Sequence, residues 1–197
     1  MTRTAILVDG VVRTVRGRPL LEELEQLFLD QGFHDMTLGQ MAAALRCSKS
    51  TLYYIGDSKE ELVAAVVKHF FRMGTDKIEE RVRDRTPGAD QLAEYLSACG
   101  DVLSAASPSF MQDLVTNSVA HDVYRVNIEA ATQRVRQIID VGVSFGNFRE
   151  VHAQFVSEIV TKTITEIGSG EIRRATGLSE SRSYRELAGL VINGIRG

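Results

Sequence analysis

The chain is poor in the residues that mark metal, redox and disordered proteins. It has two cysteines, four histidines and three prolines among 197 residues. Cys47 and Cys99 are too far apart for a zinc or redox motif, and the histidines show no ligand-like pairing, so we expect no metal site and no cofactor. The scarcity of proline and the lack of low-complexity tracts exclude a disordered chain.

Long apolar stretches are also missing. Nowhere does the sequence approach the roughly 20 apolar residues that a membrane-spanning helix requires. The apolar run at residues 5–8 ends at Asp9 and is too short for the core of a signal peptide. With 44% hydrophobic and 25% charged residues, the composition is that of a soluble globular protein. We therefore expect a cytoplasmic protein with no membrane partner.

A large excess of positive charge is absent as well. The formal net charge is −3, so any attraction for nucleic acid must come from a local patch. The first 18 residues offer one, because their only acid, Asp9, is outnumbered by Arg3, Arg13, Arg16 and Arg18. We interpret residues 1–18 as a basic N-terminal arm. Asp9-Gly10 between two short apolar runs also fits a β-hairpin, and that alternative stays open.

Residues 37–62 contain three helix starts in a short span. Thr37 and Gln40 have the spacing of a capping box, which predicts a helix from Leu38. Ser48 is a natural N-cap for a second helix over residues 49–55. Ser58 and Glu61 form another capping-box pattern at the start of a longer helix. Two short helices joined by a tight connection are what a helix-turn-helix reader of DNA requires.

The middle helix has two different faces. Helical periodicity points Leu52 and Ile55 inward together, and Ser50 and Tyr54 outward. Hydroxyls and phenols can bond phosphates or base edges, and lysine neutralises backbone charge, so this outer face suits a major groove. The alternative is that the tyrosines are ordinary core residues beside a capped turn.

Residues 19–62 resemble the DNA-binding head of the TetR family of transcriptional regulators. The matching positions are Leu20, Leu21, Leu27, Phe28, Gly32, Phe33, Thr37, Met41, Ala42, Ser48, Thr51, Leu52, Tyr53, Tyr54, Ser58, Lys59, Glu60 and Leu62. The resemblance implies a helix-turn-helix DNA-binding domain over residues 19–60. Its implied DNA contacts are Thr37, Ser48, Lys49, Ser50, Thr51, Tyr53, Tyr54 and Lys59.

Four positions in and after the turn differ from the family pattern. Arg46 stands where the family usually has glycine, so the turn either avoids positive φ or stores strain. The Ile55-Gly56 pair replaces His-Phe, which removes an aromatic ring between the third and fourth helices. Cys47 occupies the place of a buried valine, which implies an inert core thiol.

After Ser58 the sequence predicts almost only helices, and the fold class is all-α. We expect the fourth helix to run to about Arg85, further helices at residues 122–142 and 150–167, and a polar loop at residues 168–177. The Ser183-x-x-Glu186 pattern predicts the start of the final helix. The resemblance implies that residues 61–197 form a larger helical domain for ligand binding and dimerisation.

The apolar stripe of the final helix must be buried against something. Docking onto its own chain is one solution. The resemblance favours a homodimer in which the last two helices pair with their copies, since two-fold symmetry suits a palindromic operator. The implied interface residues are Phe155, Ile159, Leu187, Leu190, Val191 and Gly194.

Three possible functions remain. The resemblance implies a ligand-responsive regulator, most simply a repressor, that binds double-stranded DNA and is released by a small, largely apolar effector. The candidate pocket residues are Tyr95, Phe110, Met111, His121 and Tyr124, although aromatic and methionine stripes are usually ordinary core. The alternatives are an all-helical enzyme, for which no catalytic motif is present, or an interaction adaptor with a non-functional DNA-binding head.

Overall fold

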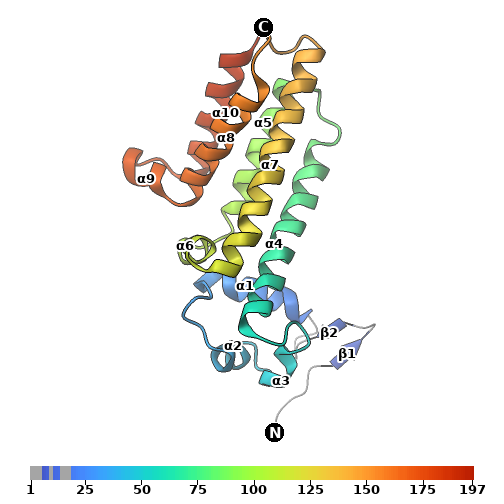
Figure 1. The fold of residues 1–197 in the computed structure, drawn as a ribbon, viewed down its shortest axis with the longest axis vertical. Helices are drawn as coiled ribbons and strands as arrows, with labels where there is room; N and C mark the ends of the chain where they lie inside the picture. Colours follow the sequence, from blue (N-terminus) through green and yellow to red (C-terminus); the bar gives the residue numbers. More distant parts are fainter. Residues whose placement is uncertain (1–5, 9–10, 14–18) are drawn as a thin grey trace. The chain divides into compact units, whose positions relative to one another are not determined.

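The computed structural model describes residues 6–8, 11–13 and 19–197, which form ten helices, one short hairpin and the loops that connect them (Figure 1). The helices are α1 (Leu20–Gln31), α2 (Leu38–Ala44), α3 (Lys49–Leu52), α4 (Lys59–Val82), α5 (Ala89–Leu103), α6 (Pro108–Thr116), α7 (Ser118–Ser144), α8 (Ala153–Gly168), α9 (Glu171–Thr176) and α10 (Glu180–Ile195). Among the described residues, no helix is both long and apolar enough to cross a membrane.

Part of the predicted N-terminal arm forms a hairpin. Strand β1 (Ile6–Val8) pairs antiparallel with β2 (Val11–Arg13), with Ile6 opposite Arg13. The structure thus favours the hairpin over the arm for these six residues. Arg3, Arg16 and Arg18 lie outside the described residues.

The chain divides into two compact units. The first comprises residues 1–72 and 106–124, and the second comprises residues 73–105 and 125–197. Helices α4 and α7 therefore contribute residues to both units. Helix α6 belongs to the first unit, together with the three short helices that the sequence assigned to a DNA-binding head.

Aromatic rings dominate the core of the first unit. Helix α1 buries Leu24 and Phe28 one turn apart. The ring of Phe33 lies 5.1 Å from that of Phe28 and 5.8 Å from that of Phe110. Phe110 of α6 also contacts Phe70 of α4 edge to face, at 5.4 Å. These pairs join α1, α4 and α6 through one cluster.

The second unit is built from longer helices packed side by side. Helix α10 lies against both α5 and α8 (Figure 1). Gly100 of α5 faces the ring of Tyr184, and a Cβ added there would lie 2.8 Å from a ring carbon. The end of α10 is held by the α7–α8 connection, because Arg149 N–H donates to the Ile195 carbonyl at 2.9 Å.

Two features of the C-terminal region differ from the sequence prediction. Helix α10 begins at Glu180, one turn before the expected start, and Ser183 is a buried residue inside it. Burial of Ser183 and Tyr184 extends the helix upstream of the capping-box pattern. Residues 171–176, expected as part of a polar loop, form the short helix α9.

Candidate nucleic-acid interface

The predicted caps set the geometry of the helix-turn-helix segment. Thr37 and Gln40 form the complete capping box at the start of α2, with both reciprocal bonds present. Ser48 caps α3 by accepting a hydrogen bond from Thr51 N at 3.2 Å. Ser58 Oγ accepts from Glu61 N at 3.1 Å at the start of α4. These three helix starts are confirmed, although α3 is α-helical only as far as Leu52.

The turn between α2 and α3 places Arg46 in the left-handed region, with φ of 55°. Its N–H bonds to Ala43 O at 3.1 Å, and Cys47 N–H bonds to Ala42 O at 2.9 Å. This pair of bonds is a Schellman motif, whose left-handed position usually holds glycine. Arginine in this conformation stores strain of about 1–2 kcal/mol. Of the two expected outcomes, a turn that avoids positive φ and a turn that stores strain, the structure shows the second.

Four predicted contact residues lie together at the surface of α3 and its following turn. Lys49 and Ser50 are exposed, and Tyr53 and Tyr54 expose 46% and 71% of their surface. A phenol as exposed as Tyr54 contributes little to the core and can reach an external partner. Thr37 is also exposed, at the first turn of α2.

Thr51 and Ser48 have a structural role instead. Thr51 is only 4% exposed, and its hydroxyl is 2.8 Å from that of Ser48. The Ser48 hydroxyl is also 2.7 Å from that of Ser50. The structure therefore does not place Thr51 on the exposed face. It places both residues in the cap that holds α3.

Lys59 is held by the turn that follows α1. Its ammonium donates to the His34 carbonyl at 2.6 Å. Lysine carries three N–H donors, so this bond leaves two for an external acceptor. The predicted phosphate contact is compatible with this geometry.

Two glycines contribute to the site in a way that the sequence analysis missed. The stem of Lys49 lies over Gly39 of α2, where a Cβ would come within 3.2 Å of Lys49 Cε. Gly56 lies against the first turn of α4, and a Cβ there would be 2.8 Å from Leu62 N. Direct backbone approach thus replaces the missing aromatic ring. The first contact joins two helices and the second joins a connecting segment to a helix, and neither follows from a helical or capping pattern.

The five predicted pocket residues are divided between the two units. Phe110, Met111 and Tyr124 are buried in the first unit, and His121 is exposed there. The ring of Tyr124 stacks on Phe71 at 5.8 Å. Tyr95 lies in the core of the second unit, where burial raises the pKa of its phenol. The four buried residues act as core in this structure, whereas His121 lies at the surface.

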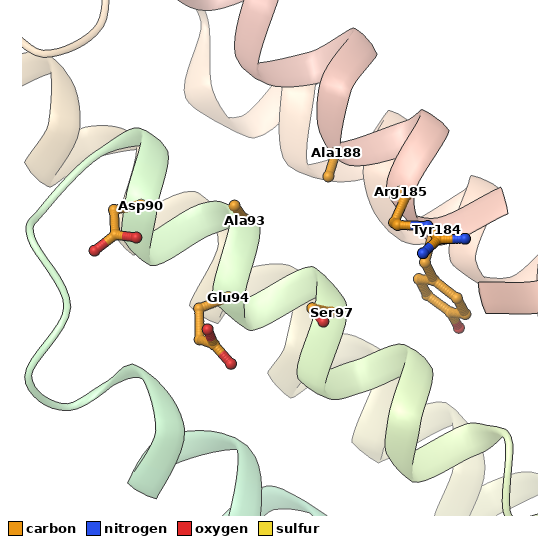
Figure 2. A pocket seen from close by; sticks show the side chains of 7 residues that line it. All are labelled: Asp90, Ala93, Glu94, Ser97, Tyr184, Arg185 and Ala188. Atoms are coloured by element: carbon orange, nitrogen blue, oxygen red, sulfur yellow. The ribbon is translucent and has the colours of Figure 1, made fainter. Parts of the chain in front are cut away.

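A groove of about 300 Å³ lies between α5 and α10 (Figure 2). None of the five predicted pocket residues lines it. Its lining residues are Asp90, Ala93, Glu94, Ser97, Tyr184, Arg185 and Ala188. The sequence analysis missed this groove because its two walls are distant in the chain.

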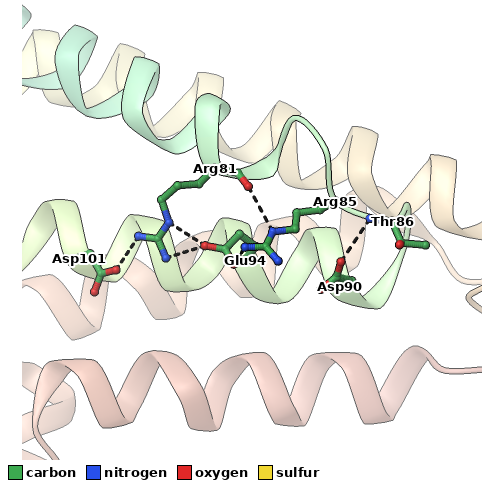
Figure 3. Close-up of polar contacts among 6 residues, drawn as sticks. All are labelled: Arg81, Arg85, Thr86, Asp90, Glu94 and Asp101. Atoms are coloured by element: carbon green, nitrogen blue, oxygen red, sulfur yellow. Dashed lines mark hydrogen bonds and ion pairs between the residues drawn. The ribbon is translucent and has the colours of Figure 1, made fainter.

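The acids of this groove already have partners at the end of α4 (Figure 3). Glu94 pairs with Arg81 at 2.6 Å and with Arg85 at 2.9 Å. Arg81 also pairs with Asp101 at 2.6 Å, and Asp90 accepts from Thr86 N at 3.3 Å. This network fastens α4 to α5 and partly neutralises the groove.

The six predicted interface residues fall into two groups. Phe155, Ile159 and Leu190 expose 64%, 45% and 75% of their surface, and Gly194 is also exposed. Leu187 and Val191 are instead buried in the core of the second unit. Most of the apolar stripe of α10 therefore packs within its own chain, and Leu190 stays exposed.

Both cysteines are free and weakly acidic. Burial raises the pKa of the Cys99 thiol to about 12 and raises that of half-buried Cys47 as well. Neither is a thiolate at neutral pH, as an inert structural role requires. Among the described residues, no cluster of three or more His, Cys, Asp or Glu could hold a metal ion.

Comparisons with known proteins agree with this geometry. The model of the bacterial regulatory proteins of the tetR family matches residues 20–66. No curated protein matches the chain. The fatty acid degradation regulator FadR from Bacillus halodurans is similar in structure, with a TM-score of 0.72 over 90% of this chain and 98% of its own, at 14% identity.

Two further solved structures share the fold. AibR, solved with isovaleryl coenzyme A and operator DNA, has a TM-score of 0.65 over 88% of this chain and 96% of its own, at 15% identity. A protein from Saccharomonospora viridis, solved with choline, has a TM-score of 0.72 over 90% and 96%, at 17% identity. The chain thus carries the DNA-binding segment of the bacterial tetR family at residues 20–66, within the all-helical fold of TetR-type transcriptional regulators.

Proposed function

We propose that this chain is a transcriptional repressor that binds a palindromic operator as a homodimer and is released by a small, largely apolar effector. The observation that carries the proposal is the exposed group on and after α3, with Tyr54 71% exposed beside Lys49 and Ser50. Lys49, Ser50 and Tyr54 would face bases, whereas Tyr53 and Lys59 would contact phosphates. Such a protein acts in the cytoplasm, where its operator is accessible.

DNA binding is tested on a palindromic duplex selected from a random pool, compared with an unselected duplex. Lys59→Ala should weaken binding to both about equally and lower the salt slope by about 2 for a dimer, roughly 1 for each lost phosphate contact. Ser50→Ala should instead change sequence preference, by about 1–3 kcal/mol if a base contact is lost.

Lys68→Ala is the matched control for Lys59→Ala. Lys68 is an exposed lysine further along α4, so its loss changes the net charge equally without touching the predicted docking face. Its salt slope should stay near that of the wild type. Equal slopes for the Lys59 and Lys68 variants would contradict the predicted docking, and failure to select any duplex would contradict DNA-specific function.

The dimer proposal rests on the outer face of α8 and α10. Phe155, Ile159 and Leu190 are large apolar residues left exposed on two neighbouring helices. Above Gly189 and Gly194 there is open space, which lets a second helix approach closely. A two-fold pair would present two heads to half-sites about 34–36 Å apart.

Light scattering after sizing chromatography tests the dimer. Phe155→Asp combined with Leu190→Asp should give a folded monomer, because each places a charge in the proposed apolar interface. Val126→Asp is the matched control, since Val126 is 57% exposed on α7, which is not one of the two helices of the proposed interface. If the wild-type chain is a monomer at micromolar concentration, the dimer proposal is wrong.

The effector proposal is supported by the neighbours solved with isovaleryl coenzyme A and choline. Effector and operator must lower each other's affinity by the same factor, because binding free energies are linked. Native mass spectrometry of the purified protein would identify a bound ligand. A tight ligand that leaves operator affinity unchanged would contradict release by effector.

A further inference from the structure

Asp113 of α6 binds the turn that follows α1. Its Oδ2 atom accepts two backbone hydrogen bonds, from Phe33 N at 2.5 Å and His34 N at 2.9 Å. Bonds from backbone N–H groups to a carboxylate are stronger than bonds between neutral groups. Gly32 leaves room for this contact, because a Cβ there would lie 2.6 Å from the same oxygen.

The opposite side of this turn holds Lys59. The His34 carbonyl accepts from the Lys59 ammonium at 2.6 Å, while the His34 N–H donates to Asp113. One residue of the turn therefore bonds both α6 and the first residue of α4. Asp113, His34 and Lys59 all belong to the first compact unit.

Apolar contacts fix the same turn from the same helix. Phe33 is buried, and its ring meets that of Phe110, which lies one helical turn before Asp113 on α6. Ser107 N at the start of α6 also donates to the Leu29 carbonyl of α1 at 2.8 Å. Helix α6 thus holds the end of α1 and the turn after it by several independent contacts.

We propose that Asp113 is a positioning residue for DNA binding. It fixes the turn at residues 32–34 and thereby holds the Lys59 ammonium where it meets a DNA phosphate. A lysine held in place before binding loses less conformational entropy on contact than a free one. This inference rests on the proposed DNA-binding function and assigns a role to a residue outside the DNA-binding segment.

Simple electrostatics predicts the opposite effect of removing Asp113. Loss of a negative charge from a DNA-binding protein should tighten binding, because the phosphate backbone attracts positive charge. A loss of affinity in Asp113→Ala can therefore not come from the change in net charge. Asp122→Ala is the matched control, because Asp122 is an exposed acid in the same unit.

A double-mutant cycle on the full chain tests the proposal, with affinity measured on the selected palindromic duplex. Asp113→Ala should weaken binding about tenfold in the wild-type background, as expected for loss of bonds to a charged group. In the Lys59→Ala background the same substitution should weaken binding by less than about twofold, since the residue it positions is gone. Asp122→Ala should leave binding unchanged or tighten it.

Asp113→Asn keeps an acceptor oxygen without the charge, and bonds to a neutral acceptor are weaker, so its affinity should lie between those of the wild type and Asp113→Ala. It also carries the test, through the same cycle, if circular dichroism finds Asp113→Ala unfolded. Equal losses in both backgrounds would overturn the proposal, because Asp113 would then act independently of Lys59. Unchanged affinity in Asp113→Ala, with wild-type protein that prefers the selected duplex, would also overturn it. Wild-type protein without that preference would instead contradict the proposed function.

Discussion

The first compact unit exposes phenols, hydroxyls and lysine on α3 and its turn, whereas the second exposes Phe155, Ile159 and Leu190 on α8 and α10. The first set suits a charged, hydrogen-bonding partner, and the second suits another apolar helix face. The difference matches the two proposed tasks, recognition of DNA and association with a second copy, which would then lie on different parts of one chain.

The units also differ in how their elements are specified. The short helices α2 and α3 of the first unit begin at side-chain caps, and a cluster of aromatic rings joins α1, α4 and α6. Longer helices in the second unit pack along apolar stripes, with Arg81 and Glu94 joining α4 to α5. Small elements need local polar signals because they cannot bury much surface alone, and long helices do not.

The aromatic core of the first unit should show the largest effect. Phe110→Ala should lower the free energy of unfolding by about 3–5 kcal/mol, because it removes a fully buried ring. Phe145→Ala in the second unit is the control, since that ring is 70% exposed, and it should change stability by less than about 0.5 kcal/mol. Urea unfolding measures both. A small loss for Phe110→Ala would mean that the ring lines a pocket rather than a packed core.

Helix packing in the second unit should give an intermediate effect. Gly100→Ala should lower stability by about 1 kcal/mol, because overpacking against Tyr184 outweighs the gain in helix propensity. Ser97→Ala on an exposed face of α5 should shift stability by less than about 0.5 kcal/mol. If Gly100→Ala is stabilising, the α5–α10 contact is looser than that of a packed core.

The strained turn of the first unit should give an effect of similar size and opposite sign. Arg46→Gly should raise the free energy of unfolding by roughly 1 kcal/mol, because glycine adopts positive φ without a steric penalty. Arg46→Ala removes the same charge but keeps the Cβ, so it should not gain this stability. Equal melting temperatures for the two variants would show that any change from the wild type comes from loss of the guanidinium and not from relief of backbone strain.

Sequence reasoning succeeded where a local signal determines a local structure. Thr37, Ser48 and Ser58 each begin a helix where predicted, since a cap acts within one turn. It gave no sign that Thr51 is buried, because a hydroxyl at this position could equally face DNA or bond Ser48. The Asp113 contact spans 80 residues, so no local pattern could have indicated it.

The C-terminal helices mark the limit of pattern reasoning. The stripe of α10 is wide enough to include Leu187, Leu190 and Val191, and only packing against α5 decides that Leu190 stays outside. Ser183 matched a capping box, yet burial against the core continued the helix upstream through it. Hydrophobic periodicity predicts that a helix exists. The neighbouring helices against which it packs determine where it begins and which of its side chains are buried.

Gly56 constrains the order in which this chain can accept mutations. A side chain at this position would meet Leu62 N at 2.8 Å and the Glu61 carbonyl carbon at 2.9 Å, and these backbone atoms move only with the first turn of α4. A bulky residue at position 56 is therefore harmful until a second substitution has displaced that turn. The two substitutions are therefore tolerated only if the one that displaces the turn comes first. This dependence on order is epistasis between position 56 and the first turn of α4.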